Sequence, residues 1–157
     1  YFFKNQKFLK GRGKINKVKN FNKSFYLIDE SYNANPLSVK SAIENFSKIK
    51  KNGKRKYFLF GDMLELGKNS SMYHKNISKI INKSDIDKTF VYGEKSAETY
   101  KLLKKNKKGE VLKNLNSFDQ KISMILKNGD YLLIKGSNAT NLHKVSNRFL
   151  RRSANAI

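Results

Sequence analysis

The sequence predicts an α/β domain with a mostly parallel sheet that carries helices on both faces. Short apolar segments alternate with helix-period stretches of roughly ten to fifteen residues, a pattern typical of consecutive β-α units. The length of 157 residues fits one domain, with at most a fragment of a second. The most distinctive polar residues follow the strands, where such sheets bind ligands.

Five apolar segments are expected to be strands, and a sixth, near residues 14–19, can pair at the sheet edge. Each of the five is followed by a turn or by the start of a helical pattern. The order along the chain is therefore β-α repeated five times. The five segments are residues 24–28, 56–60, 89–92, 110–112 and 131–134.

Helix starts and apolar faces define the helical stretches. Asn35 before Pro36 is a strong start, because Asn caps helices and Pro suits the first helical position. Ser117 has Gln120 three residues later, a capping-box pattern. We expect helices after these two starts, after the loop 61–67, near 96–105 and over 138–150, with residues 153–157 as a tail. Their apolar faces include Val39, Ile43 and Phe46, then Tyr73, Ile77 and Ile81, then Phe118, Ile122 and Leu126, and then Leu142, Val145 and Phe149.

The net charge of +22 suggests a polyanion partner such as nucleic acid. Only five of the 34 basic residues are Arg, the residue that base-reading and bidentate phosphate sites favour. The lysines are spread along the whole chain, and Asn and Ile are abundant too, as an AT-rich coding bias would produce. We favour that bias, and a nucleic-acid groove stays as the alternative.

Several classes of site are excluded by composition. There is no Cys, which removes disulfides, thiolate nucleophiles and cysteine-based metal centres. His74 and His143 lie far apart in sequence and inside expected helices, so we expect packing or surface roles for them rather than catalysis. No apolar run approaches the ~20 residues of a membrane span. The chain does not begin with Met, so we expect a fragment whose start lies upstream.

Two motifs have the chemistry to bind a nucleotide. In Gly11-Arg12-Gly13, flexible glycines flank an Arg that can swing onto a phosphate, although an ordinary linker would look the same. Asp29 and Glu30 end a strand and can accept ribose hydroxyls or hold a metal. Tyr32 can stack on a base, and the amides of Asn33 and Asn35 can read its edge. The alternative for this second motif is a simple turn that caps the next helix.

Two further loops offer charged groups at the expected edge. Asp62 and Glu65 follow a strand and could receive an ammonium group, or be ordinary solvated acids. Lys135-Gly136-Ser137 precedes a helix, so its N–H groups could bind an anion, or Ser137 could be a helix cap. No Walker A loop and no Gly-x-Ser-x-Gly motif occurs in the sequence.

These motifs, taken in order, resemble the Mur ligase family over nearly all of residues 11–150. The resemblance implies the C-terminal, Rossmann-like three-layer sandwich of a three-domain enzyme of peptidoglycan synthesis. Residues 1–13 would then be the end of the central ATPase domain and a hinge, 14–152 the C-terminal domain and 153–157 a tail. The motifs are Gly11-Arg12-Gly13, Ile28 to Pro36 with Ser38, Gly61 to Gly67 with His74 downstream, and Lys135-Gly136-Ser137.

The resemblance also implies an activity. Such an enzyme adds D-alanyl-D-alanine to UDP-N-acetylmuramoyl-tripeptide in the bacterial cytoplasm, through an acyl phosphate formed with ATP. ATP and Mg²⁺ would be held mainly by the central domain, which carries the P-loop, the magnesium ligands and a carbamylated lysine. We therefore expect the 157-residue chain alone to be inactive. The open alternatives are a basic nucleic-acid-binding domain and a stand-alone nucleotide-binding module.

The resemblance assigns roles to residues of this chain. Arg12 resembles the arginine that meets the ATP phosphates. Either Asp29 or Glu30 contacts ribose or an interdomain lysine, and both stay open at this point. The adenosine contacts would be Tyr32, Asn33 and Asn35, and the loops facing the incoming dipeptide would supply Asp62, Glu65, Lys135 and Ser137.

Overall fold

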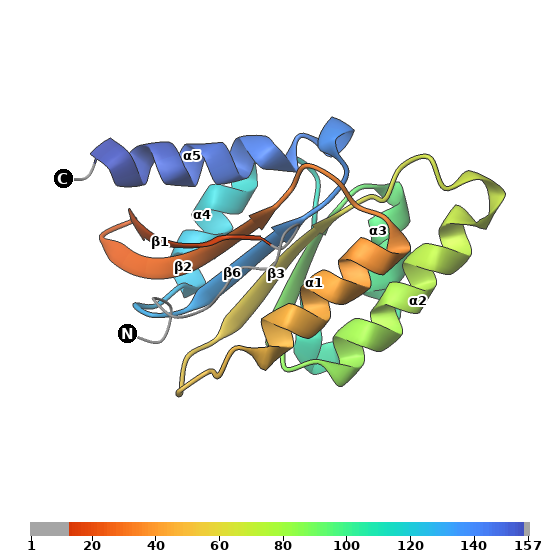
Figure 1. The fold of residues 1–157 in the computed structure, drawn as a ribbon, viewed down its shortest axis with the longest axis horizontal. Coiled ribbons are helices and arrows are strands. Elements are labelled where there is room, and N and C mark those ends of the chain that lie inside the picture. Colours follow the sequence, from red (N-terminus) through yellow and green to blue (C-terminus); the bar gives the residue numbers. More distant parts are fainter. Residues whose placement is uncertain (1–12, 156–157) are drawn as a thin grey trace.

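The computed structural model describes residues 13–155, and Arg12 lies outside them. Its centre is a six-stranded sheet in the order β1-β2-β6-β3-β4-β5 (Figure 1). The β1–β2 pair is antiparallel, and the other neighbouring pairs are parallel. The strands are β1 (Ile15–Asn20), β2 (Lys23–Glu30), β3 (Lys56–Gly61), β4 (Lys88–Tyr92), β5 (Lys108–Leu112) and β6 (Tyr131–Lys135).

Helices cover both faces of this sheet, which confirms the predicted three-layer α/β class. Helices α1, α2 and α3 lie on one face, and α4 and α5 lie on the other. Three short 3₁₀ turns complete the chain: η1 (Gly67–Asn69), η2 (Lys105–Lys107) and η3 (Asn138–Thr140). The helices are α1 (Pro36–Lys48), α2 (Ser70–Lys83), α3 (Glu94–Lys101), α4 (Asn116–Ile125) and α5 (Leu142–Asn155).

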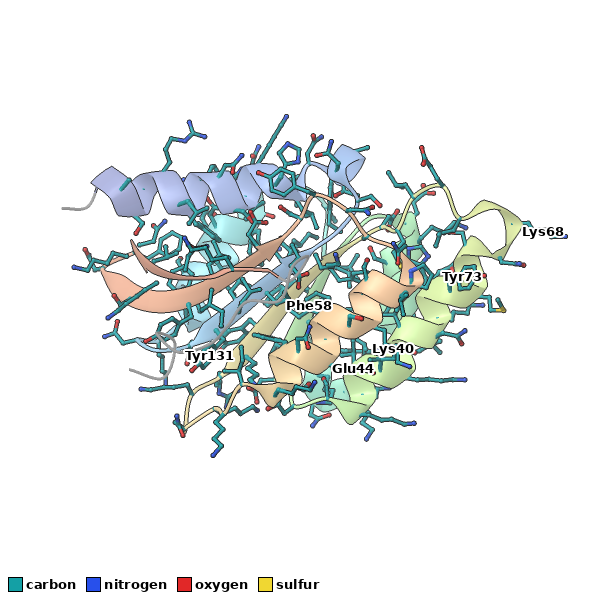
Figure 2. All side chains as sticks on the ribbon, in the orientation of Figure 1. Lys40, Glu44, Phe58, Lys68, Tyr73 and Tyr131 are labelled. Atoms are coloured by element: carbon teal, nitrogen blue, oxygen red, sulfur yellow. The ribbon has the colours of Figure 1, made fainter. Side chains whose placement is uncertain are left out.

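Strand β3 explains why the central strands are apolar without alternation. Phe58 and Phe60 pack into the core on the α1–α2 side, while Tyr57 and Leu59 pack into the core on the α4–α5 side. A strand between two helical layers has no face for water, so all its residues are buried. Figure 2 shows Phe58 inside, and Lys40 and Glu44 on the side of α1 toward α2, where they form an exposed pair at 3.9 Å.

The predicted edge strand near 14–19 is β1, which forms a hairpin with β2. Phe21 and Asn22 make the two-residue turn, with φ of 56° and 58°. Two positive φ values are what a type I′ hairpin turn requires, and Asn tolerates them better than Phe does. This hairpin puts the only antiparallel pairing of the described sheet at one edge.

The helix start at Asn35 is confirmed, but the start at Ser117 is wrong. Asn35 Oδ1 accepts from the Ser38 N–H at 2.8 Å, and the Asn35 N–H donates to Ser38 Oγ at 3.0 Å. At α4, the Asn114 amide oxygen accepts from the Ser117 N–H at 3.0 Å. The capping side chain is therefore that of Asn114, three residues earlier, and Ser117 lies inside the helix, which begins at Asn116.

Two other helices differ from expectation at both ends, and α5 begins at Leu142 rather than at 138, because the 3₁₀ turn η3 occupies Asn138–Thr140. Helix α3 begins directly after Gly93 and ends at Lys101, so it is shorter than the expected 96–105. Helix α5 continues to Asn155, and it therefore includes the first residues of the expected tail. Among residues 13–155, no helix has the length and apolar character needed to cross a membrane.

Candidate functional site

The carboxyl ends of β2, β6, β3 and β4 meet at one edge of the sheet, and their loops carry the predicted residues. The parallel register places Lys135 beside Glu30 on one side and beside Phe60 on the other. Loops that are distant in sequence, 29–35, 61–67 and 135–138, are therefore neighbours. Figure 1 shows this edge at the opposite end of the sheet from the β1–β2 turn.

Asp29 organises the loop after β2. Its Oδ1 accepts from the Ser31 backbone N–H at 3.1 Å, from the Ser31 hydroxyl and from Ser146 Oγ at 2.9 Å. Because Ser146 belongs to α5, this carboxylate ties the loop to the opposite helical layer. Three donors within the protein therefore occupy Asp29 Oδ1, and they give this oxygen a structural role.

Glu30 and Lys135 carry charges of opposite sign on adjacent strands, and Glu30 is half-buried while Lys135 is buried. The Gly13 backbone N–H donates to the Glu30 carboxylate. Burial raises the pKa of Glu30, and attraction to Lys135 acts against that rise. Burial likewise lowers the pKa of Lys135, whose Nζ donates to the Asn33 carbonyl at 2.6 Å. The pair thus connects the segment at Gly13 to the loop that holds Asn33.

Tyr32 stacks on His143, a contact that the sequence did not indicate. The ring centroids are 5.8 Å apart and the planes differ by 22°. Tyr32 is 59% exposed, so much of the ring is accessible to a ligand. His143 Nδ1 is buried and has no hydrogen-bond partner among residues 13–155. The expected packing role of His143 is confirmed. Its packing partner, Tyr32, is one of the candidate site residues.

The two asparagines of this loop have different positions. Asn35 caps α1, as described above, so its side chain is already engaged. Asn33 is exposed, and its backbone carbonyl holds Lys135. The side chain of Asn33 is therefore the amide that a ligand could reach.

Asp62 and Ser137 join the loops to one another. Asp62 caps α3, since its carboxylate accepts from the Ser96 N–H at 2.7 Å and the Lys95 N–H at 3.4 Å. Ser137 Oγ accepts from the Leu64 N–H at 2.9 Å, and the Ser137 N–H donates to the Asp62 carbonyl at 3.1 Å. Ser137 precedes the η3 turn without a side-chain cap, so the helix-cap alternative is wrong.

Glu65 is the exposed acid of the loop after β3. Its backbone has φ of 62°, a left-handed conformation that turns the chain outward. The neighbouring Leu64 is also exposed. Among the predicted acids, Glu65 is therefore better placed than Asp62 to meet a ligand.

His74 fixes the start of the same loop. It is fully buried, its Nε2 accepts from the Met63 N–H at 3.0 Å, and its Nδ1 faces the Ser70 carbonyl at 2.7 Å. With both ring nitrogens engaged, His74 is a packing residue, as predicted. No group of three His, Asp or Glu side chains within residues 13–155 could hold a metal ion.

Gly61 and Gly136 lie close together where β3 and β6 end, and both contact Leu142 at the start of α5. A Cβ on Gly61 or on Gly136 would lie 2.6 Å from Leu142 Cδ1. A Cβ on Gly136 would also lie 3.2 Å from Gly61 Cα. These two loops and the start of α5 therefore approach too closely for any larger residue.

Comparison with known proteins identifies the fold. The family model "Mur ligase, glutamate ligase domain" matches residues 15–138. Among solved structures, MurF ligase from Thermotoga maritima in complex with ADP has a TM-score of 0.74 at 23% identity, covering 98% of this chain and 33% of that one. A MurF from Acinetobacter baumannii has a TM-score of 0.73 at 21% identity, covering 94% and 32%.

Curated relatives agree. A UDP-N-acetylmuramoyl-tripeptide–D-alanyl-D-alanine ligase from Buchnera aphidicola is 37% identical over 134 residues, which are 81% of this chain and 27% of the relative. The corresponding ligase from Rickettsia prowazekii is 31% identical, over 87% of this chain and 29% of the relative. The chain thus spans less than a third of these relatives. Because the model of this domain matches residues 15–138, which are most of the chain, the chain belongs to the Mur ligase family.

Proposed function

We propose that this chain is the C-terminal part of a bacterial, cytoplasmic, ATP-dependent ligase that adds D-alanyl-D-alanine to UDP-N-acetylmuramoyl-tripeptide. The two relatives described above carry that name at 37% and 31% identity. The observation that carries the proposal is the convergence of the loops 29–35, 61–67 and 135–138 at one sheet edge, with Tyr32, Asn33 and Glu65 exposed there.

The loop after β2 would take the nucleotide. Tyr32 offers its exposed face for stacking on the adenine, and Asn33 offers an amide for its edge. Asp29 is already bonded to Ser31 and Ser146, whereas Glu30 accepts from the Gly13 N–H alone among residues 13–155. We therefore favour Glu30 as the contact to ribose or to a lysine of another domain.

The loops after β3 and β6 would take the dipeptide. Glu65 is the exposed carboxylate that can hold the dipeptide ammonium until the amine attacks. Asp62 and Ser137 would act indirectly, because their hydrogen bonds hold the loops in register. Lys135 has donors beyond the one used on Asn33, so it can also face a carboxylate.

The remaining steps would need the rest of the enzyme. ATP would phosphorylate the tripeptide carboxylate, the dipeptide amine would attack the acyl phosphate, and phosphate would leave. Holding the reactants together can supply ~7–11 kcal/mol of such a barrier. Arg12, outside the described residues, would reach the ATP phosphates when the domains close. Mg²⁺ would be held mainly by the central domain of the complete enzyme.

The experiment is to express the complete reading frame and follow product formation. We expect amide product only when ATP, UDP-N-acetylmuramoyl-tripeptide and D-alanyl-D-alanine are all present, and none from the 157-residue chain alone. Incubation with other dipeptides is the control for acceptor class. Product formed equally well from unrelated dipeptides, or no product from the complete enzyme, would contradict the proposal.

A further inference from the structure

A pocket of about 540 Å³ lies at the end of the molecule opposite the candidate site. Three segments that are distant in sequence form it: the β1–β2 turn, the loop before β6 and the end of α5. Figure 1 shows the turn and the C-terminal end of α5 together at this end. Its polar lining consists mainly of Lys19, Asn20, Asn22, Lys23, Asn128 and Arg152.

Hydrogen bonds fix the pocket walls in place before any ligand arrives. The Lys19 N–H donates to Ser153 Oγ at 2.9 Å, which joins the hairpin to α5. The Ser24 N–H donates to Asn128 Oδ1 at 2.9 Å, which joins the hairpin to the loop before β6. A pocket held in this way loses little conformational entropy when it binds a ligand.

The lining has positive charge and no acidic residue. Arg152 uses Nη1 on Asp119 at 2.9 Å, and the other donors of its planar guanidinium can serve a ligand. Within the described part of the chain, the ammonium groups of Lys19 and Lys23 form no salt bridge. Three cations therefore line a space without an acidic residue. Arg152 is paired with Asp119 outside the lining, and Lys23 Nζ donates to the Ser123 carbonyl at 2.6 Å, which leaves two further donors on that ammonium.

Asn20 supplies an observation independent of charge. The residue is only 9% exposed, and its Nδ2 is buried without a hydrogen-bond partner among residues 13–155. Buried amide donors are nearly always paired, so an unpaired one needs an explanation. Asn20 is one of the residues that line the pocket, so this unpaired amide belongs to the pocket wall.

We infer that this pocket is a binding site for a phosphate-type oxyanion. Lys19, Lys23 and Arg152 match its charge, and the Asn20 amide matches its acceptor oxygens. The site is separate from the nucleotide site, because β2 runs from Lys23 at the pocket to Glu30 at the other edge, about 23 Å at the usual rise per residue. The inference does not depend on the proposed ligase function.

The test is a phosphate titration of the 157-residue chain, followed by amide chemical shifts in NMR. We expect saturable shifts in residues 19–24, 128 and 152, with small shifts elsewhere. The double variant Lys19→Gln/Arg152→Gln should bind at least tenfold more weakly, and Asn20→Asp, nearly isosteric but negative, should bind more weakly as well. Asp119 keeps its two bonds to Arg148 in the double variant, so the fold should be retained.

The matched control is Lys75→Gln/Lys79→Gln, which removes the same charge from the α2 surface. We expect its phosphate affinity to stay within twofold of the parent chain. Equal losses in both double variants, or shifts spread over the lysine-rich surface, would overturn the site. The same would follow if a short oligonucleotide bound all variants alike and displaced phosphate, because the charge would then act as a diffuse surface.

Glycerol 3-phosphate distinguishes the two sources of the oxyanion. If it binds more tightly than inorganic phosphate and loses that affinity in Asn20→Asp, the natural ligand class is an organic phosphate. If the two bind equally and both depend on Asn20, the site takes the free anion. Either result supports the site. If Asn20→Asp changes the affinity for neither ligand, the proposed role of the Asn20 amide is overturned.

Discussion

Lys56 and Lys135 are both buried lysines on adjacent central strands, but they lie at opposite edges of the sheet. Lys56 is fully buried at the start of β3, and its Nζ donates to the Phe46 carbonyl at 2.8 Å, the Ile49 carbonyl at 2.5 Å and Asp85 at 2.7 Å. Lys135 is 5% exposed at the end of β6 and donates to the Asn33 carbonyl.

The difference lies in how the three donors of each ammonium are used. Lys56 donates to two carbonyls at the C-terminal end of α1, that of Phe46, which also accepts from the Ile49 N–H at 3.2 Å, and that of Ile49. Lys107 does the same after α2, through the Ser84 and Ile86 carbonyls at 2.7 and 2.9 Å. At the amino ends of the strands, buried lysines thus bind helix-end carbonyls, whereas at the carboxyl ends Lys135 Nζ donates to one acceptor among residues 13–155.

The largest expected effect is on stability, in Lys56→Met. The change removes a buried donor from the Phe46 and Ile49 carbonyls and from Asp85, which should lower the free energy of unfolding by about 3 kcal/mol. Urea denaturation of the 157-residue chain measures it. Lys51→Met, which removes a partly exposed pair with Asp87 at 2.9 Å, is the control and should cost below about 1 kcal/mol. Similar losses in the two variants would remove the special role of Lys56.

The next effect is on turnover, in Lys135→Met of the complete enzyme. Loss of one charged hydrogen bond at the site should reduce kcat/KM by roughly tenfold to a hundredfold. The free energy of unfolding should fall less than in Lys56→Met, because one described acceptor is lost rather than three. Steady-state kinetics beside urea denaturation separates the two effects. Unchanged kinetics with a large loss of stability would make Lys135 another structural lysine.

A smaller effect is expected in His143→Ala, which removes the support of Tyr32. Aromatic pairs contribute about 0.5–1.5 kcal/mol, so the KM for ATP should rise roughly two- to tenfold while kcat changes little. His143→Phe keeps the stack and should restore the KM. An equal defect in both variants would show that the imidazole nitrogens, rather than the stack, support the site.

The smallest effect is a pH dependence of stability that comes from Glu30. Burial raises its folded pKa above the usual glutamate value of 4.5, so the folded state holds the proton to higher pH than the unfolded chain does. The contribution of Glu30 to the free energy of unfolding is therefore largest below pH 4.5, and it is lost as the pH rises through the folded pKa. Glu30→Gln has no proton to lose at this position. The free energy of unfolding of the variant should therefore rise relative to that of the parent chain as the pH rises. A constant difference from pH 4 to 7 would contradict the raised pKa.

The local patterns of the sequence were sufficient for the fold. The apolar run of β3 and the Asn35-Pro36 start of α1 depend on neighbours along the chain, so spacing and capping chemistry identify them. The predicted cap of α4 at Ser117 is wrong because Asn114, three residues earlier, accepts from the Ser117 N–H. Both residues are good helix caps, and propensity alone does not decide between them.

The candidate site was predictable in its loops but only partly in its residues. Strand ends locate the loops, because parallel strands share a carboxyl edge. The stack of Tyr32 on His143 joins residues that are far apart in sequence, and Asp62 caps a helix that begins some thirty residues later. Such contacts depend on how the layers pack, and a single sequence carries no local signal for them.

The division of the carboxyl edge into a nucleotide side and a dipeptide side can be tested by one set of kinetics. In the complete enzyme, KM for ATP and KM for D-alanyl-D-alanine are measured separately in Tyr32→Ala and Glu65→Gln. We expect Tyr32→Ala to raise the KM for ATP severalfold and leave that for the dipeptide, and Glu65→Gln to do the reverse. Both variants raising the same KM, or neither changing any, would contradict the assignment of the two loops.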